Sequence, residues 1–141
     1  MQTFKIQLLL ILAFPILGCG GEDNGIAPVS GTVFFKGKPL PNATVNFSPK
    51  GENSRGATGT TDKDGKYRLT SFQINDGAKI GKYSVTIRAE EGGDGALKAK
   101  DDIDYARGKL VTPKKYSDSA SSGLTAEIAK KNNIIDFQLT E

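Results

Sequence analysis

The single cysteine of this chain, Cys19, is the residue whose type and setting point most directly to chemistry. The sequence has 141 residues, with one Cys and with neither His nor Trp. Cys19 ends an apolar run and is followed by Gly20 and Gly21. One cysteine excludes an intramolecular disulfide, and its glycine neighbours and polar sequel argue against a thiol buried as a small hydrophobe. The residues that precede Cys19 must therefore indicate what chemistry its thiol serves.

The residues before Cys19 have the layout of an export signal. Lys5 supplies one positive charge, and the twelve positions 6–17 that follow are apolar except for Gln7 and Pro15. A membrane-spanning helix needs about 20 residues, so this run is too short to remain in a membrane. The alternative is a buried N-terminal strand or helix. A charged start, an apolar middle and a small residue before cysteine favour a secretory signal instead.

The tetrapeptide Ile16-Leu17-Gly18-Cys19 resembles a bacterial lipobox. The resemblance implies that diacylglycerol is attached to the thiol, and that a signal peptidase cuts before Cys19 because Gly18 is small. The new amino group of Cys19 is often acylated as well, and two or three acyl chains make anchoring stable where one does not. We therefore predict a signal peptide over 1–18 and a lipoprotein held at the membrane of the cell envelope through lipid, such as palmitate, on Cys19.

A flexible tether is predicted for residues 19–28, which have little to pack and several turn formers. The nine residues after Cys19 span at most about 30 Å when extended, so the domain is expected to lie close to its membrane. Gly20 stands where enteric bacteria use Asp to keep lipoproteins in the inner membrane. Its presence weakly favours the outer membrane.

Residues 29–141 consist of short alternating segments separated by turns. The clearest is 83–89, where apolar and polar residues alternate. The last two segments are expected to form a hairpin across 130–133, with Ile135, Phe137 and Leu139 entering the core. Strands are predicted at 29–35, 44–48, 55–61, 66–70, 83–89, 124–129 and 134–139. Seven strands at this spacing predict an all-β fold, a seven-stranded antiparallel β-sandwich.

One segment, 90–112, interrupts this rhythm because it is long, charged and poor in apolar residues. Loops longer than about 12–15 residues are usually functional or disordered. A surface excursion is the main expectation for this irregular loop, with a short helix over 96–107, and a binding loop is the alternative.

Four segments together resemble a known family: VSGTVFFKGKPLPNATVNFSPKG, GTTDKDGKYRL, GKYSVTI and PKKYSDSASSGLTAEI, with FQL near the end. They are similar to small bacterial lipoproteins that carry a transthyretin-like, or carboxypeptidase regulatory-like, domain. The resemblance implies a prealbumin-like or Ig-like sandwich over 29–141 in an exported, anchored protein. In that family the stretch before PKKYSD varies in length. The family supplies no catalytic residues, so none is assigned.

Two acidic groups could bind a cation, and neither is predicted to do so. Asp62, Asp64 and Gly65 begin like a calcium loop, but position twelve, where an EF-hand needs Glu, is Gln73. A tight turn is expected there instead. The aspartates at 101, 102 and 104 lie among Lys and Arg, which favours a solvated face of mixed charge. Tyr105 and Tyr116 are stacking platforms or, as is more usual for tyrosine, cap the edge of the core.

The net charge and the absence of His argue against nucleic-acid binding and against hydrolase activity. The net charge is +3, with 19 Lys and Arg spread along the chain, so no nucleic-acid partner is predicted. We expect a non-enzymatic structural or binding module that contacts an envelope protein or a surface polymer, with no cofactor and no metal. The alternative is a hydrolase on a transthyretin-like fold. Without His or a G-x-S-x-G motif, no nucleophile and base can be paired.

Overall fold

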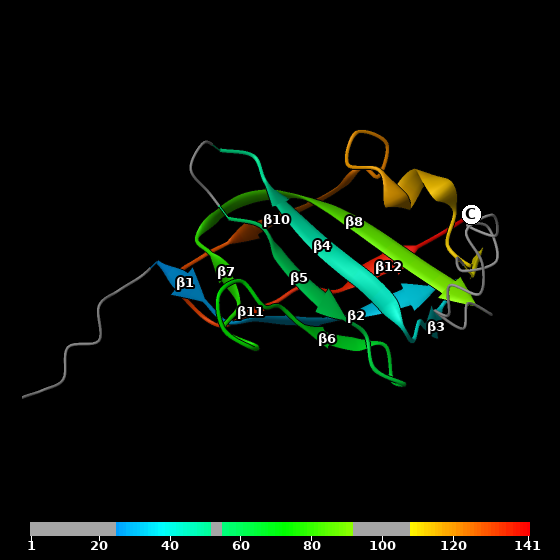
Figure 1. Cartoon of the computed structure of the whole chain (residues 1–141), viewed down its shortest axis with the longest axis horizontal. Helices are drawn as coiled ribbons and strands as arrows, with labels where there is room; N and C mark the ends of the chain where they lie inside the picture. The colour runs from blue at the N-terminus through cyan, green and yellow to red at the C-terminus, as the bar shows by residue number, and fades with distance from the viewer. Residues whose placement is uncertain (1–24, 52–54, 92–107) are drawn as a thin grey trace, which may run out of the picture.

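Buried and exposed side chains alternate along the longer strands, so each of these strands has one face for a core. In β4 (Ala43–Pro49) and β8 (Gly81–Glu91) every second residue is buried over most of the length, as in sheets with one dry face. The computed structural model describes residues 25–51, 55–91 and 108–141, and its two main sheets face each other (Figure 1). The predicted all-β sandwich is confirmed. Within these residues, no helix has the length and apolar character needed to cross a membrane.

The first sheet is antiparallel throughout and centres on the β4–β8 pair. Its strand order is β10 (Leu124–Ile128), β8, β4 and β5 (Ala57–Thr60), and β9 (Lys109–Leu110) pairs with the far end of β8. The register of β4 and β8 runs from Ala43 opposite Ala89 to Pro49 opposite Tyr83. This long pairing places Val45 and Phe47 beside Val85 and Ile87 on the inner face, as the alternation predicts.

The second sheet is built around β2 (Val29–Phe35), which has partners along both edges. On one edge, β6 (Lys66–Arg68) and β3 (Lys38–Pro39) pair with it antiparallel. On the other edge, β11 (Asn133–Ile134) and β12 (Phe137–Leu139) pair with it in parallel. The first long strand therefore pairs with the last segment of the chain.

Short elements complete the ends of the sandwich. Strands β1 (Ile26–Ala27) and β7 (Ala78–Lys79) form a small antiparallel ribbon where the described chain begins. The 3-10 helix η1 (Lys114–Ser117) packs Tyr116 against the other end of the core. Lys36 and Gly37, with φ of 52° and 76°, make the turn between β2 and β3, since tight hairpins need positive φ there.

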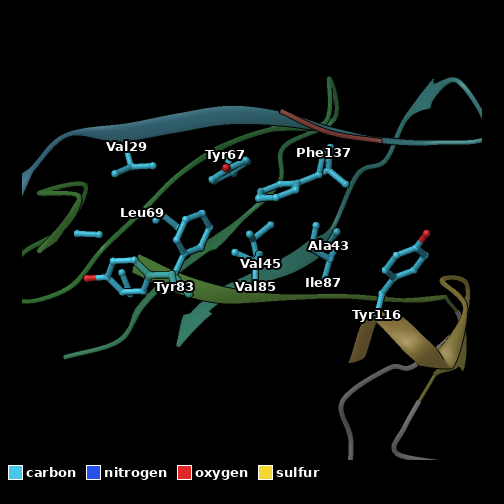
Figure 2. Packing of buried hydrophobic residues seen from close by; sticks show 14 of the residues in the cluster. Val29, Ala43, Val45, Tyr67, Leu69, Tyr83, Val85, Ile87, Tyr116 and Phe137 are labelled. Carbon is cyan, nitrogen blue, oxygen red and sulfur yellow. The ribbon is translucent and has the colours of Figure 1, made fainter. Parts of the chain in front are cut away.

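A cluster of four aromatic rings holds the two sheets together, and three of them, Tyr67, Tyr83 and Phe137, are labelled in Figure 2. The ring of Phe47 lies 6.5 Å from that of Tyr67, 5.7 Å from Tyr83 and 6.1 Å from Phe137, within the usual range for aromatic pairs. Phe47 and Tyr83 come from the first sheet, whereas Tyr67 and Phe137 come from the second. Aliphatic side chains fill the remaining volume: Val33, Val45, Leu69, Val85, Ile87, Ile128 and Leu139.

One side of the sandwich is closed by the backbone. The amide of Thr58 donates to the Thr70 carbonyl at 3.0 Å, and that of Thr70 donates back at 2.8 Å. These bonds connect β5 of the first sheet to the chain just after β6 of the second. Gly59 allows the approach, because a Cβ there would overlap the carbonyl oxygen of Arg68.

A second close crossing involves Gly31, Tyr67 and Ile135. The Ile135 amide donates to the Ser30 carbonyl at 2.8 Å, between the two short strands β11 and β12. The Tyr67 hydroxyl donates to the Ile135 carbonyl at 2.7 Å. Gly31 lies beneath this carbonyl, and a Cβ at position 31 would overlap its oxygen. The missing side chain therefore lets the end of the chain settle against β2.

The hairpin predicted for residues 124–139 is wrong. β10 pairs with β8 in the first sheet, whereas β11 and β12 pair with β2 in the second. Asn133 directs the crossing, since its Nδ2 donates to the Ala129 and Lys131 carbonyls while its Oδ1 accepts from the Ala129 amide. Phe137 and Leu139 enter the core as predicted, and Ile135 is half-buried against it.

Two predicted boundaries shift. Ala27 is only 2 % exposed and belongs to β1, so residues 26 and 27 of the tether expected over 19–28 belong to the fold. The irregular loop expected over 90–112 is shorter, because Glu90 and Glu91 end β8 and pair with Leu110 and Lys109 of β9. The helix expected over 96–107 lies outside the described residues.

Replacing Gly31 tests the crossing at Ile135. We expect Gly31→Ala to lower the free energy of unfolding by about 3 kcal/mol, since the added methyl group must displace backbone rather than a flexible side chain. Urea denaturation of both proteins measures the difference. Gly51→Ala is the matched control, because a Cβ there meets no atom within 4 Å. Equal losses in the two variants would contradict the crossing.

Candidate functional site

A groove of about 830 Å³ lies over the outer face of β2, β6 and β5. These strands belong to different sheets, and the backbone bridge between Thr58 and Thr70 makes them one curved surface. Their outward side chains line the groove together with the turn at Asp62, the loop at Asn75, and Ile134 of β11. The outward residues of the three strands are Ser30, Thr32, Thr58, Thr60, Lys66 and Arg68.

The groove combines hydroxyl groups with two cations that have no carboxylate partner. Within the described part of the chain, neither Lys66 nor Arg68 forms an ion pair. The two carboxylates of the lining already accept backbone donors. Asp136 Oδ1 accepts the Thr32 amide at 2.7 Å, and Asp62 Oδ1 accepts the Lys66 amide at 2.9 Å. The lining therefore offers cationic and hydroxyl donors to a ligand more readily than free carboxylates.

Tyr67 lines the groove from the core side, and its role is to hold the neighbouring backbone in position. Its ring is 2 % exposed, and its hydroxyl is committed to the Ile135 carbonyl. Burial, and then the negative charge of Asp136, raise the pKa of Tyr67 above its ordinary value. The phenol therefore stays protonated and keeps its hydrogen bond over the physiological pH range. This residue holds the floor of the groove in place.

The loop over 71–77 forms one end of the groove and is organised by Asp76. Its carboxylate accepts the amides of Ser71 at 2.7 Å and of Phe72 and Gln73 at 2.9 Å. Burial alone would raise the pKa of Asp76, but these backbone donors hold the pKa below its ordinary value. Asn75, with φ of 61°, follows this turn and contributes to the lining.

A second hollow of about 510 Å³ adjoins the groove across Thr58 and Thr70 and extends over β4. Asn46 and Thr86 are among the residues that line it. Arg55 borders it, and the guanidinium lies 4.7 Å from the centre of the Phe72 ring, a cation–π distance. The two hollows follow one another along the outer surface of the joined sheets.

Several residues singled out in the sequence lie outside the described residues: Gly18, Cys19, Asp101, Asp102, Asp104 and Tyr105. The turn predicted at Asp62 is confirmed, with Asp62 Oδ1 accepting the Asp64 amide at 2.9 Å and Gly65 at φ 73°. Tyr116 caps the core edge as expected, at 6 % exposure. Among residues 25–51, 55–91 and 108–141, no three Cys, Asp or Glu side chains lie close enough to hold a metal ion.

The groove itself was not found from the sequence. Its signal was present, since hydroxyl residues alternate outward along β2 and β5, and Lys66 and Arg68 alternate outward along β6. Alternation locates the outer face of each strand but does not say which strands are neighbours. Only the pairing of β2 with β6, and the bridge from Thr58 to Thr70, bring these faces together.

Comparison with known proteins leaves the family open. No family model and no curated protein matches the sequence. The fold is similar to a DUF3823 family protein from Parabacteroides merdae, at 12% identity and a TM-score of 0.43 over 84% of this chain and 47% of that one. It is also similar to a 9R-lipoxygenase from Cyanothece, at 12% identity and a TM-score of 0.41 over 83% of this chain and 16% of that one. The chain spans less than half of either structure, and neither assigns it a function.

The Asp76 carboxylate makes loop stability depend on pH. We expect Asp76→Asn to lower the free energy of unfolding at pH 7 by about 2 kcal/mol, because hydrogen bonds to a charged acceptor are stronger than those to an amide. The folded pKa lies below the unfolded one. The carboxylate therefore stabilises the fold above its unfolded pKa, and this contribution is lost as the pH falls through the folded pKa.

Denaturation curves of wild type and Asp76→Asn between pH 2 and pH 7 should converge at acid pH. Asp64→Asn is the control, since the side chain of Asp64 is exposed in the turn at the opposite end of the sandwich. A difference that persists unchanged at the lowest pH would contradict the role of the charge.

Proposed function

We propose that this protein is a lipid-anchored protein of the bacterial cell envelope that acts as a non-enzymatic binding module. The observation that carries the proposal is the lipobox-like sequence Ile16–Cys19, placed after a short apolar run and six residues before the first described residue, Gly25. Lipid on Cys19 would hold the sandwich at a membrane. Gly20 favours the outer membrane. The transthyretin-like resemblance of residues 29–141 agrees with this assignment.

We place the contact surface of the module in the groove over β2, β6 and β5. Its hydroxyl groups and the two unpaired cations, Lys66 and Arg68, suit a polar partner that carries acidic groups. Such groups occur on envelope proteins and on surface polymers. Ile134, which is 77% exposed at the rim, adds a small apolar contact. A groove open along its length suits an extended segment of a partner better than a small molecule.

The absence of histidine supports binding over catalysis. The chain has no His, the usual general base near neutral pH. The one tyrosine that contacts the groove, Tyr67, is buried and its hydroxyl is already bonded. A hydrolase would need a base beside one of the groove hydroxyls, and the carboxylates there accept backbone amides instead.

The lipid anchor is tested by labelling. Cells that express the wild type should incorporate radioactive palmitate into this protein, and cells that express Cys19→Ala should not, because the modified sulfur is missing. The variant should also keep its leader and migrate as the larger precursor. Equal labelling of both proteins would contradict the anchor.

The groove is tested by charge reversal. We expect the double variant Lys66→Glu/Arg68→Glu to lose most of its crosslinks to envelope components when living cells are treated with formaldehyde. Lys38→Glu/Lys114→Glu, which changes the same charge at exposed positions that do not line the groove, should crosslink like the wild type. Circular dichroism verifies that both variants fold. Equal crosslinking by the two variants would place the contact elsewhere.

A further inference from the structure

The large hydrophobic side chains that are exposed in the described residues all lie at one end of the sandwich. Phe72 is 53% exposed, Ile74 88%, Ile80 43% and Ile134 77%. Phe72 and Ile74 come from the loop between β6 and β7, Ile80 from the turn before β8, and Ile134 from β11. These elements meet where β1 and β7 lie, opposite the C-terminus (Figure 1).

The described chain begins among these side chains. The Ile80 amide donates to the Gly25 carbonyl at 2.9 Å, and β1 pairs with β7 directly before Ile80. The Asn133 amide, next to Ile134, donates to the Pro28 carbonyl at 3.0 Å. The loop that carries Phe72 and Ile74 ends at Gly77, which packs directly against Ala27. The approach is so close that a Cβ at Gly77 would overlap the Ala27 carbonyl. A membrane anchor attached to the chain before Gly25 would therefore be connected to this end of the sandwich.

Basic residues lie near the exposed hydrophobic side chains: Lys79 precedes Ile80 in the chain, and the Arg55 guanidinium lies over the Phe72 ring. These basic residues lie next to the turns of the end that holds β1 and β7. The acidic residues described at this end include Asp76 and Glu127. Asp76 is occupied by three backbone amides. The opposite end is mixed in charge, with ion pairs from Lys36 to Glu141 and from Arg88 to Glu90. The basic residues of the N-terminal end are Lys50, Arg55, Lys79, Lys82, Lys130 and Lys131.

We propose that this end of the sandwich docks on the surface of the lipid bilayer, with Phe72, Ile74 and Ile80 inserted among the headgroups. The inference rests on the proposed lipid at Cys19. Six residue steps separate Cys19 from Gly25, a span of at most about 20 Å, so the anchored end cannot leave the membrane surface. Exposed apolar side chains with lysines nearby match an interface of anionic headgroups over acyl chains.

This orientation has a consequence for the groove. Ile134 and Arg68 lie toward the docked end, because they pair with Ser30 near the start of β2. Lys66 pairs with Thr32, further along the same strand. The groove therefore opens at the side of the anchored domain, close to the membrane surface, rather than at its outer tip.

The absence of Trp from the chain makes the docking measurable. Ile74→Trp introduces a single indole at the most exposed of the hydrophobic positions, and Phe72→Trp is a second probe in the same loop. Lys63→Trp is the control, since residue 63 lies in an exposed turn at the opposite end. Each lipidated full-length protein is placed in vesicles of phosphatidylglycerol and phosphatidylcholine with brominated acyl chains.

We expect blue-shifted emission, and quenching by the brominated lipid several-fold stronger for I74W and F72W than for K63W. Mass spectrometry of the same samples verifies the lipid on Cys19. Equal quenching of all three indoles in lipidated protein would overturn the docking and leave the anchor intact. A blue shift without quenching would also overturn it, in favour of contact with a second copy of this chain. An unmodified Cys19 in wild-type protein from the envelope would remove the anchor, and the docking with it.

Discussion

Two places where backbone meets backbone without room for a side chain, Gly31 and Gly59, determine how the sheets of this protein join. At Gly59 the edge strand β5 lies against the carbonyl of Arg68 and connects one sheet to the other. At Gly31 the final segment of the chain lies over β2, and the Tyr67 hydroxyl satisfies the carbonyl that is brought inward. Buried carbonyls need such partners, since an unpaired one costs about 1–3 kcal/mol.

The groove is a product of the same joints. Because β5 and β6 are connected at Thr58 and Thr70, the outer faces of two sheets become continuous and curve around a shared hollow. Asp62 and Asp136 accept amides from this region, which uses their charge to hold β6 and β2 in position. Lys66 and Arg68 are left to face the solvent. The groove therefore presents positive charge to a partner, because its two carboxylates are used to accept backbone amides.

The strands and their buried faces could be predicted from the sequence, because period-two alternation depends only on neighbouring residues. Tyr83, Val85 and Ile87 are buried as predicted. The partner of the last segment could not be predicted in this way. The local pattern predicts a hairpin over 130–133. In the structure, the Asn133 side chain donates hydrogen bonds to carbonyls of this turn, and the chain crosses to the other sheet. The groove depends on the same long-range pairing, which alternation does not encode.

The parallel pairing of β2 with β12 constrains the timing of folding. Strand β2 has Phe137–Leu139 as one of its neighbours, so the second sheet cannot be completed until residues 137–139 are available. Contacts that join distant parts of a chain also form slowly. A growing polypeptide that has not reached residue 137 would therefore leave β2 without one of its neighbours. The sandwich can close only when Phe137 and Leu139 are in place in its core.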